Sequence, residues 1–330
     1  MTQNPRHIVI SDHEHALPYS KGLMASSIMA TGLAPARAFH VAERIEERLH
    51  ERPGDSITRA ELADLARAVL VDEVGQRYAD SFAKWQLVNQ IDRPLIILIG
   101  GATGVGKSTV ATQLAGRLGI TRIIPSDAIR EVMRAMFTEE LMPTLHTSSF
   151  DAVHLVRHPL PLSADPVIIG FREQASAVAV GAHALMRRAV TEGTDLILEG
   201  AHLVPGFFDP AEFTEAVVVQ LVITVDDPDA HRSHFLARAH ESRSRAPERY
   251  FDFFDNIRKI QRYVKSLALE RSVPIVPSYN LDATLSLVIE LVVSRAMQAS
   301  PSTNGSRPAR LSSKTEPGGL SGISERKRHR

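Results

Sequence analysis

The sequence contains a glycine-rich loop of a type that cradles phosphate oxygens. The run GGATGVGKST occupies positions 100–109 and includes Lys107 and Ser108. Glycines let the backbone curl so that successive N–H groups point inward, and a following helix adds the positive end of its dipole. The lysine can reach the β- and γ-phosphates of a nucleotide, and the serine hydroxyl can ligate Mg²⁺. The pattern predicts an ATP and Mg²⁺ site formed by Gly101, Ala102, Thr103, Gly104, Val105, Gly106, Lys107, Ser108 and Thr109.

Two carboxylates stand where predicted strands end. Asp127 follows the apolar run at 121–124, and Glu199 ends the apolar run at 195–199. Ligands of open α/β sheets bind beyond the carboxyl ends of the strands, so both side chains are expected near the loop. Asp127, one strand along from the loop, can accept the proton of an attacking hydroxyl, while Glu199 can hold Mg²⁺ through water. The plainer alternative makes Ser126 or Asp127 a helix N-cap and Glu199 a strand-end cap.

Arginines complete the predicted site. Arg130 lies three residues after Asp127 on the same helical face and can hold an anionic group of an acceptor. A second cluster of arginines lies at 232–249, in a segment with weak apolar periodicity. Such a segment is typical of a lid that closes over phosphates, and we expect Arg238 and Arg245 to act in catalysis together with Lys107. An ordinary basic helix face is the alternative.

These residues need a parallel sheet to bring them together. Apolar runs at 94–99, 121–124, 195–199, 217–225 and 273–277 have the composition of strands in such a sheet, and helical patterns separate them. Together with the glycine-rich loop, this order predicts the α/β, three-layer fold of a P-loop NTPase or P-loop kinase, with a parallel sheet over residues 94–299.

Residues 1–93 predict a small, mostly helical domain ahead of the sheet. Thr58 and Glu61 have capping-box spacing, and apolar residues recur at helical intervals between 38 and 49. A β-like start, the aromatic-x-lysine of Tyr19 and Lys21, and the helix AERIEERL resemble an ATP-cone, a nucleotide-binding regulatory module. The resemblance implies a second nucleotide site, and a structural or lid-like appendage is the alternative.

The composition excludes several classes of protein. The 330 residues include 38 basic and 38 acidic side chains and no cysteine, which rules out a disulfide scaffold, a thiolate zinc site and a cysteine nucleophile. No apolar stretch reaches the ~18 residues that span a bilayer and no secretory signal is present, so we expect a cytoplasmic protein without a membrane partner. Residues 300–330, with seven basic and two acidic side chains, predict a disordered tail. Nucleic acid is not expected as a partner except through that tail.

Several motifs go beyond the general pattern of a phosphate-binding loop. They are PSDAIREVMR at 125–134, LMPTLHTSSF at 141–150, IIGFREQ at 168–174, LILEGAHLVPG at 196–206, ARAHESRSRAPERY at 237–250 and FDNIRKIQRY at 254–263. Together with the loop, they make residues 94–280 resemble the 2-phosphoglycerate kinases. This resemblance implies a small anionic phosphorylated substrate, 2-phosphoglycerate, whose free hydroxyl is phosphorylated to give 2,3-diphosphoglycerate. It also implies acceptor contacts from residues 146–149 and cations from Arg130, Arg134 and Arg172.

Two alternatives stay open at this level. Related kinases use a similar Asp-x-x-Arg on sugars, nucleotide sugars or nucleic-acid ends, and a regulatory protein could bind ATP as a signal with no acceptor at all. The pair of Asp127 and Arg130 favours an enzyme, because a sensor needs no acceptor base. The sequence leaves the oligomeric state undetermined, and a homo-oligomer stays open.

Overall fold

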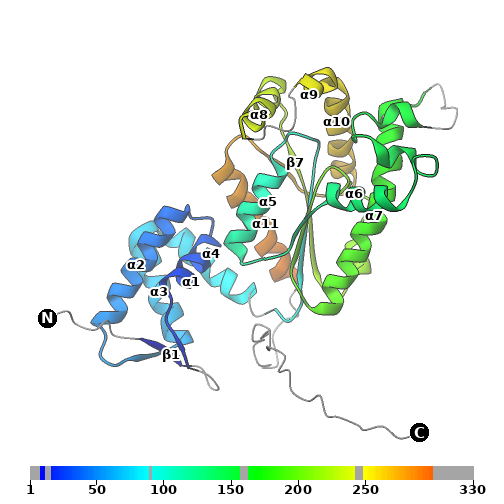
Figure 1. Cartoon of the computed structure of the whole chain (residues 1–330). Helices are drawn as coiled ribbons and strands as arrows, with labels where there is room; N and C mark the ends of the chain where they lie inside the picture. Colours follow the sequence, from blue (N-terminus) through cyan, green and yellow to red (C-terminus); the bar gives the residue numbers. More distant parts are fainter. Residues whose placement is uncertain (1–7, 12–15, 89–90, 157–162, 242–247, 300–330) are drawn as a thin grey trace, which may run out of the picture.

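The computed structural model describes residues 8–11, 16–88, 91–156, 163–241 and 248–299. Within these ranges the chain forms two sheets, one of three strands near the N-terminus and one of five strands in the larger part (Figure 1). None of the described helices has the length and apolar character needed to cross a membrane.

Five parallel strands form the sheet that carries the predicted site. Their order across the sheet is β5 (Ile123–Pro125), β6 (Leu196–Glu199), β4 (Leu95–Gly100), β7 (Val217–Thr224) and β8 (Ile275–Pro277). Every residue of β4 and β7 is buried, as expected of inner strands that helices cover on both faces. The α/β class and the five strands predicted from the sequence are confirmed.

Helices cover the two faces of this sheet and complete three layers (Figure 1). One apolar core joins Ile97 and Ile99 to the helices α5 (Lys107–Leu118), α10 (Phe254–Glu270) and α11 (Leu281–Ala299). The other joins Ile96 and Leu98 to α6 (Ser126–Met136) and the second half of α7 (Pro166–Glu192). Successive β4 residues alternate between the two cores because strand side chains point to opposite faces.

Shorter elements connect the strands of this sheet. The helices α8 (Pro228–Glu241) and α9 (Glu248–Asp252) follow β7, and 3₁₀ turns form at Pro143–His146, Ala152–Leu155 and Pro210–Glu212. In Figure 1, α8 and α9 lie together at one end of the sheet. The turn at Pro143–His146 and the helices α8 and α9 overlap the segments in which the sequence predicted acceptor and lid contacts, whereas the other two turns lie outside those segments.

The N-terminal residues form a smaller unit with its own apolar core. It contains the strands β1 (Val9–Ser11), β2 (Ala16–Pro18) and β3 (Ser56–Thr58), and the helices α1 (Lys21–Met29), α2 (Pro35–Glu51), α3 (Arg59–Val74) and α4 (Gln76–Val88). The predicted capping box is confirmed, because the Thr58 side chain and the Glu61 side chain each bond the other residue's backbone N–H.

This unit packs against the helix that follows the phosphate loop. Helix α1 contacts α5 and helix α4 contacts α11, and Ala30, Trp85 and Val88 join the larger core. Lys21 is paired with Glu46 at 3.0 Å. The division at residues 93 and 94 and the ATP-cone assignment stay predictions, and the predicted tail at 300–330 lies outside the described residues.

Candidate active site

The phosphate loop connects β4 to α5 in the predicted way. Gly104 and Gly106 have φ values of 85° and 89°, a left-handed conformation that glycine adopts without strain. Lys107 is buried, and its Nζ donates a 2.7 Å hydrogen bond to the carbonyl oxygen of Ala102. The side chains of Ala102 and Val105 lie in the apolar core, so these two residues can offer a ligand only backbone groups.

The structure brings Ser108 and Glu199 together. The Ser108 hydroxyl donates to Glu199 Oε1 at 2.8 Å. The contact follows from the sheet, because β6 pairs with β4 and places Glu199 opposite Ile99. Glu199 is buried, with 7% of its surface exposed. A hydroxyl and a carboxylate at this position are oxygen donors of the kind that Mg²⁺ prefers.

Asp127 lies two strands from the loop, not one. Strand β6 is inserted between β5 and β4, and Asp127 begins α6 just beyond the end of β5. The N-cap interpretation is wrong: Pro125 is the N-cap residue, and no side chain caps this helix. Ser126 instead turns inward to His202.

The surroundings of the Asp127 carboxyl group favour its ionised form. Its side chain is 65% exposed and receives a 3.3 Å contact from Arg130 Nε. Partial burial acts to raise its pKa, but His202, Arg130 and Lys107 outweigh that effect and lower the pKa below the ordinary value for aspartate. His202 is itself neutral at physiological pH. The positive charges that keep the pKa of Asp127 low at this pH are therefore those of Arg130 and Lys107.

Arg130 has a different set of contacts from the one that the sequence suggested. Its Nη1 donates to the carbonyl oxygens of Leu145 at 2.8 Å and Thr147 at 3.3 Å. Its Nη2 donates to Glu131 at 2.7 Å. The guanidinium group therefore holds the 143–149 segment in place, and the Arg130 side chain is only 13% exposed.

A buried polar network joins the sheet to the same segment, and sequence reasoning missed it. Ser126 Oγ lies 2.8 Å from His202 Nδ1, and His202 Nε2 lies 3.0 Å from Gln174 Oε1. The Gln174 amide then donates to the carbonyl oxygens of Thr144 and Thr147. Burial lowers the pKa of His202 to about 4, with smaller contributions from nearby charges, so its ring is neutral. The neutral ring accepts from Ser126 and donates to Gln174.

A cavity of about 840 Å³ joins the predicted groups. Its walls come from the phosphate loop, the start of α6, the end of β6, the segment 148–150 and α9. They include five of the seven predicted catalytic or metal-binding side chains, namely Lys107, Ser108, Asp127, Arg130 and Glu199, and also Ser148, Ser149 and Arg249. Such a cavity can hold a nucleotide phosphate at one end and a small acceptor beside Asp127.

Other predicted residues lie elsewhere. Arg134 is paired with Glu131 at 2.9 Å, and neither Arg134 nor Arg172 lines the cavity. His146 bonds the carbonyl oxygen of Phe137 at 3.0 Å, and Thr147 bonds Asp151. Of the acceptor segment, the serines at 148 and 149 face the cavity.

The predicted lid is described in part. Arg232 lies 4.4 Å from the centre of the Phe254 ring and is paired with Asp229, away from the cavity. Arg249 lies in the cavity wall, 3.3 Å from Asp151. The side chain of Arg238 and the whole of Arg245 lie outside the described residues.

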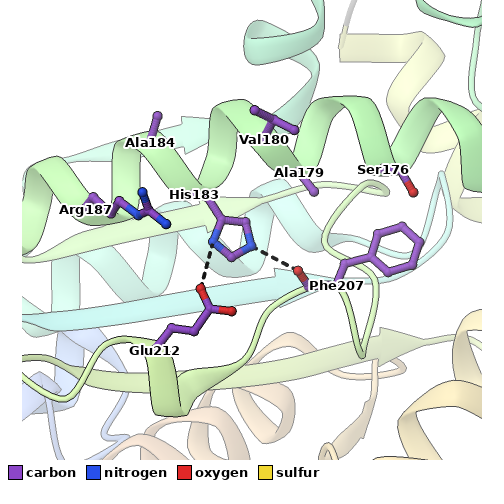
Figure 2. A pocket seen from close by; sticks show the side chains of 8 residues that line it. All are labelled: Ser176, Ala179, Val180, His183, Ala184, Arg187, Phe207 and Glu212. Carbon is purple, nitrogen blue, oxygen red and sulfur yellow. Dashed lines mark hydrogen bonds and ion pairs between the residues drawn. The ribbon is translucent and has the colours of Figure 1, made fainter.

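A second hollow lies on the outer face of α7 (Figure 2). It has a volume of about 730 Å³ and shares no lining residue with the cavity at the loop. Figure 2 shows the His183 ring turned from α7 toward the carbonyl of Phe207 and the carboxylate of Glu212, 3.0 and 3.9 Å away. This hollow contains no nucleotide-binding loop, so the cavity beside Lys107 is the candidate active site.

The chain has close relatives among known kinases, although no protein-family model matches it. It is 35% identical over 294 residues to the 2-phosphoglycerate kinase of Methanopyrus kandleri, covering 89% of each chain. It is 37% identical over 282 residues to that of Methanothermobacter thermautotrophicus, covering 85% of this chain and 92% of the relative. Shikimate kinase from Acinetobacter baumannii aligns with 64% of this chain and 97% of its own, at 16% identity and a TM-score of 0.36. The resemblance noted in the sequence is confirmed by the two relatives, and the chain belongs to the 2-phosphoglycerate kinase family.

Proposed function

We propose that this protein transfers the γ-phosphoryl group of ATP to the free hydroxyl of 2-phosphoglycerate, which gives 2,3-diphosphoglycerate and ADP. Membership of the family supports the acceptor. The observation that carries the reaction type is the single cavity that contains both the phosphate loop and Asp127. A protein that bound ATP only as a signal would need no carboxylate at the far end of such a cavity.

Asp127 is the proposed base. The acceptor hydroxyl oxygen forms a bond to the γ-phosphorus while the bond from that phosphorus to the β,γ-bridging oxygen breaks and ADP leaves. The hydroxyl proton passes to the Asp127 carboxylate. The lowered pKa of Asp127 keeps this carboxylate ionised and ready to accept the proton near neutral pH.

The proposed nucleotide site is the loop at 101–109. Its backbone N–H groups bind the phosphates, and Lys107 exchanges its bond to Ala102 for the β- and γ-phosphate oxygens. Ser108 and Glu199, which are hydrogen-bonded to each other, would hold Mg²⁺, Glu199 through a water molecule. The bound Mg²⁺ neutralises charge on the phosphate oxygens.

Arginines are the proposed partners of the acceptor's phosphate and carboxylate. Arg249 and Arg130 are the arginines that line the cavity, and Ser148 and Ser149 supply hydroxyl donors beside them. Arg130 uses part of its guanidinium group for backbone carbonyls, so its main task here is to place the serines. Arg238 and Arg245 are proposed to approach the transferred phosphoryl group from the lid.

The test is ATP turnover by the purified full chain in the presence of Mg²⁺. We expect ADP to form rapidly with 2-phosphoglycerate and only slowly with 3-phosphoglycerate, glycerate or no acceptor. Detection of 2,3-diphosphoglycerate in the same reaction identifies the product. Equal turnover with and without an acceptor would contradict the kinase proposal. A faster reaction with another phosphorylated acid would mean that this acid, and not 2-phosphoglycerate, is the acceptor.

A further inference from the structure

One face of α8 is bound to the backbone of the phosphate loop. His231 Nε2 lies 2.8 Å from the carbonyl oxygen of Thr103, and His234 Nδ1 lies 3.1 Å from that of Gly104. Phe235 lies on the same face, since residues three and four apart on a helix are neighbours. None of these three side chains lines the cavity, so this part of α8 contacts the loop from outside the cavity.

The contact with Phe235 is close enough to explain the glycine at position 104. A Cβ atom built on Gly104 would lie 2.3 Å from Phe235 Cζ. Phe235 is fully buried and stacks on Tyr250, with 4.9 Å between the ring centres. Its stacking on Tyr250 keeps the Phe235 ring from moving away, so the loop can approach α8 only because residue 104 has no side chain.

The two histidines determine which way two peptide groups of the loop face. A trans peptide unit is planar, so its C=O and N–H point in opposite directions. A Thr103 carbonyl bonded to His231 therefore turns the N–H of Gly104 away from α8. A Gly104 carbonyl bonded to His234 does the same for the N–H of Val105. Inward-facing N–H groups are what a phosphate loop offers to its ligand.

Arg258 determines the tautomer of His231. Its Nη1 lies 3.4 Å from His231 Nδ1, and its guanidinium group also donates to the carbonyl oxygens of Val225 at 2.7 Å and Asp226 at 2.6 Å. A guanidinium group can only donate, so Nδ1 must accept and the ring proton is on Nε2. Burial lowers the pKa of His231 to about 4, which agrees with a neutral ring. His231 is thereby fixed as a donor to Thr103.

We propose that His231 and His234 are positioning residues for ATP: from α8 they hold the Thr103 and Gly104 carbonyls, so that the amides of Gly104 and Val105 face the nucleotide phosphates. The proposal rests on the proposed nucleotide site but not on the identity of the acceptor. The proposal predicts that the affinity for ATP depends more on where the hydrogen-bond donor lies in the side chain at each position than on the size or polarity of that side chain.

In the experiment, each histidine is replaced in turn by glutamine and by asparagine. Glutamine places its Nε2 near the position of a histidine Nε2, and asparagine places its Nδ2 near that of a histidine Nδ1. We expect His231→Gln and His234→Asn to bind ATP within about twofold of the unaltered protein, since each keeps one hydrogen bond. We expect His231→Asn, His234→Gln and the two alanine variants to raise the dissociation constant roughly 3- to 10-fold, the effect of one lost hydrogen bond.

Binding is measured by calorimetry with ATP and Mg²⁺ and without acceptor, on the full chain. Ser233→Ala is the matched control, because Ser233 is exposed on the same helix and bonds only the backbone of Asp229. Steady-state rates add a second readout: the KM for ATP should rise while the KM for the acceptor stays within about twofold.

The outcomes separate the two proposals. No ATP binding by the unaltered protein would overturn the nucleotide site itself. If the unaltered protein binds ATP and the glutamine and asparagine variants at each histidine position bind ATP equally well, the role of the histidines is wrong while the nucleotide site stands. If an alanine variant fails to fold, the comparison of glutamine with asparagine at the same position still decides.

Discussion

The Ser108 hydroxyl and the Glu199 carboxylate are 2.8 Å apart although 91 residues separate them in the chain. The pairing of β6 with β4 produces this contact, since it sets Glu199 opposite the strand residue that precedes Gly100. The two oxygen donors lie together in the wall of the cavity beside the phosphate loop. In the proposed magnesium site, Ser108 would bind the ion, Glu199 would hold it through water, and the substrate phosphates would complete the coordination.

The first prediction concerns this pair. Glu199→Gln removes the negative charge but keeps the hydrogen bond to Ser108, so folding should be retained. We expect the Mg²⁺ concentration for half-maximal activity to rise roughly tenfold or more, in line with the loss of an outer partner of a bound metal. A titration of activity with Mg²⁺ at saturating ATP checks this, and Glu212→Gln, an exposed carboxylate at the other hollow, is the control. An unchanged Mg²⁺ requirement would remove Glu199 from the metal site.

The second prediction concerns Asp127. Asp127→Asn should lower kcat by roughly 10²- to 10⁴-fold, the usual contribution of a general base, and should leave the affinity for ATP within about twofold. Because the pKa of Asp127 lies below its ordinary value, the rate of the unaltered enzyme should not fall through this group between about pH 8 and about pH 6. Single-turnover rates across this range check the rate and its pH dependence, and calorimetry with ATP checks the affinity. Full activity of a folded Asp127→Asn variant would exclude it as the base.

The parts of the site with a local pattern could be predicted from the sequence. The loop at 100–109 needs only its own residues, a preceding apolar strand and a following helix, and all of these are contiguous. Glu199 could be placed because it ends an apolar run. The order of the strands could not be read in the same way, because pairing depends on contacts between distant segments. The insertion of β6 between β4 and β5 therefore set Asp127 one strand further from the loop than expected.

The buried network escaped prediction for a related reason. His202 lies 76 residues from Ser126 and 28 from Gln174, and a single histidine produces no periodic signal. The spacing of Asp127 and Arg130 placed both on one helix face, but it carried no information on which carbonyl oxygens the guanidinium group would bond. A polar glutamine on the buried face of α7 was the one available sign of an internal partner.

The third prediction concerns stability in acid. The pKa of His202 falls from 6.5 to about 4 on folding, so the unfolded chain binds more protons between these values. The resulting stabilisation is fully present above about pH 6.5 and is lost as the pH falls toward about 4, because the buried ring must then take up a proton. His202→Gln, which cannot take up a proton, should show a correspondingly smaller fall in the free energy of unfolding between these pH values. Urea unfolding at a series of pH values checks this.

An exposed residue without a titratable side chain supplies the control for that experiment. Ser233 is exposed on α8, and Ser233→Ala should leave the pH dependence as it is in the unaltered protein. His231, whose pKa is also about 4, should maintain part of the acid dependence in the His202→Gln variant. Identical slopes for the unaltered protein and the His202→Gln variant would mean that His202 is not held neutral by burial.

The last prediction separates positioning of the acceptor segment from contact with the acceptor. Arg130 and Gln174 donate to the same carbonyl oxygen, that of Thr147, but Gln174 is fully buried and lines no part of the cavity. Gln174→Met keeps the approximate size of the side chain and removes its donors. If the bonds to the segment place Ser148 and Ser149, this variant should raise the KM for the acceptor roughly 5- to 10-fold while the dissociation constant for ATP stays within about twofold.

Arg130→Lys completes the comparison, because a lysine retains the positive charge but cannot reach two carbonyl oxygens in a fixed fork. We expect it to raise the KM for the acceptor as Gln174→Met does, and the double variant to show less than the product of the two effects, since both residues hold one segment. Steady-state kinetics with varied acceptor at saturating ATP measures all three variants. A large effect of Arg130→Lys with no effect of Gln174→Met would instead show that Arg130 acts by its own contact with the substrate, and that the Thr147 carbonyl is not the point through which the segment is placed.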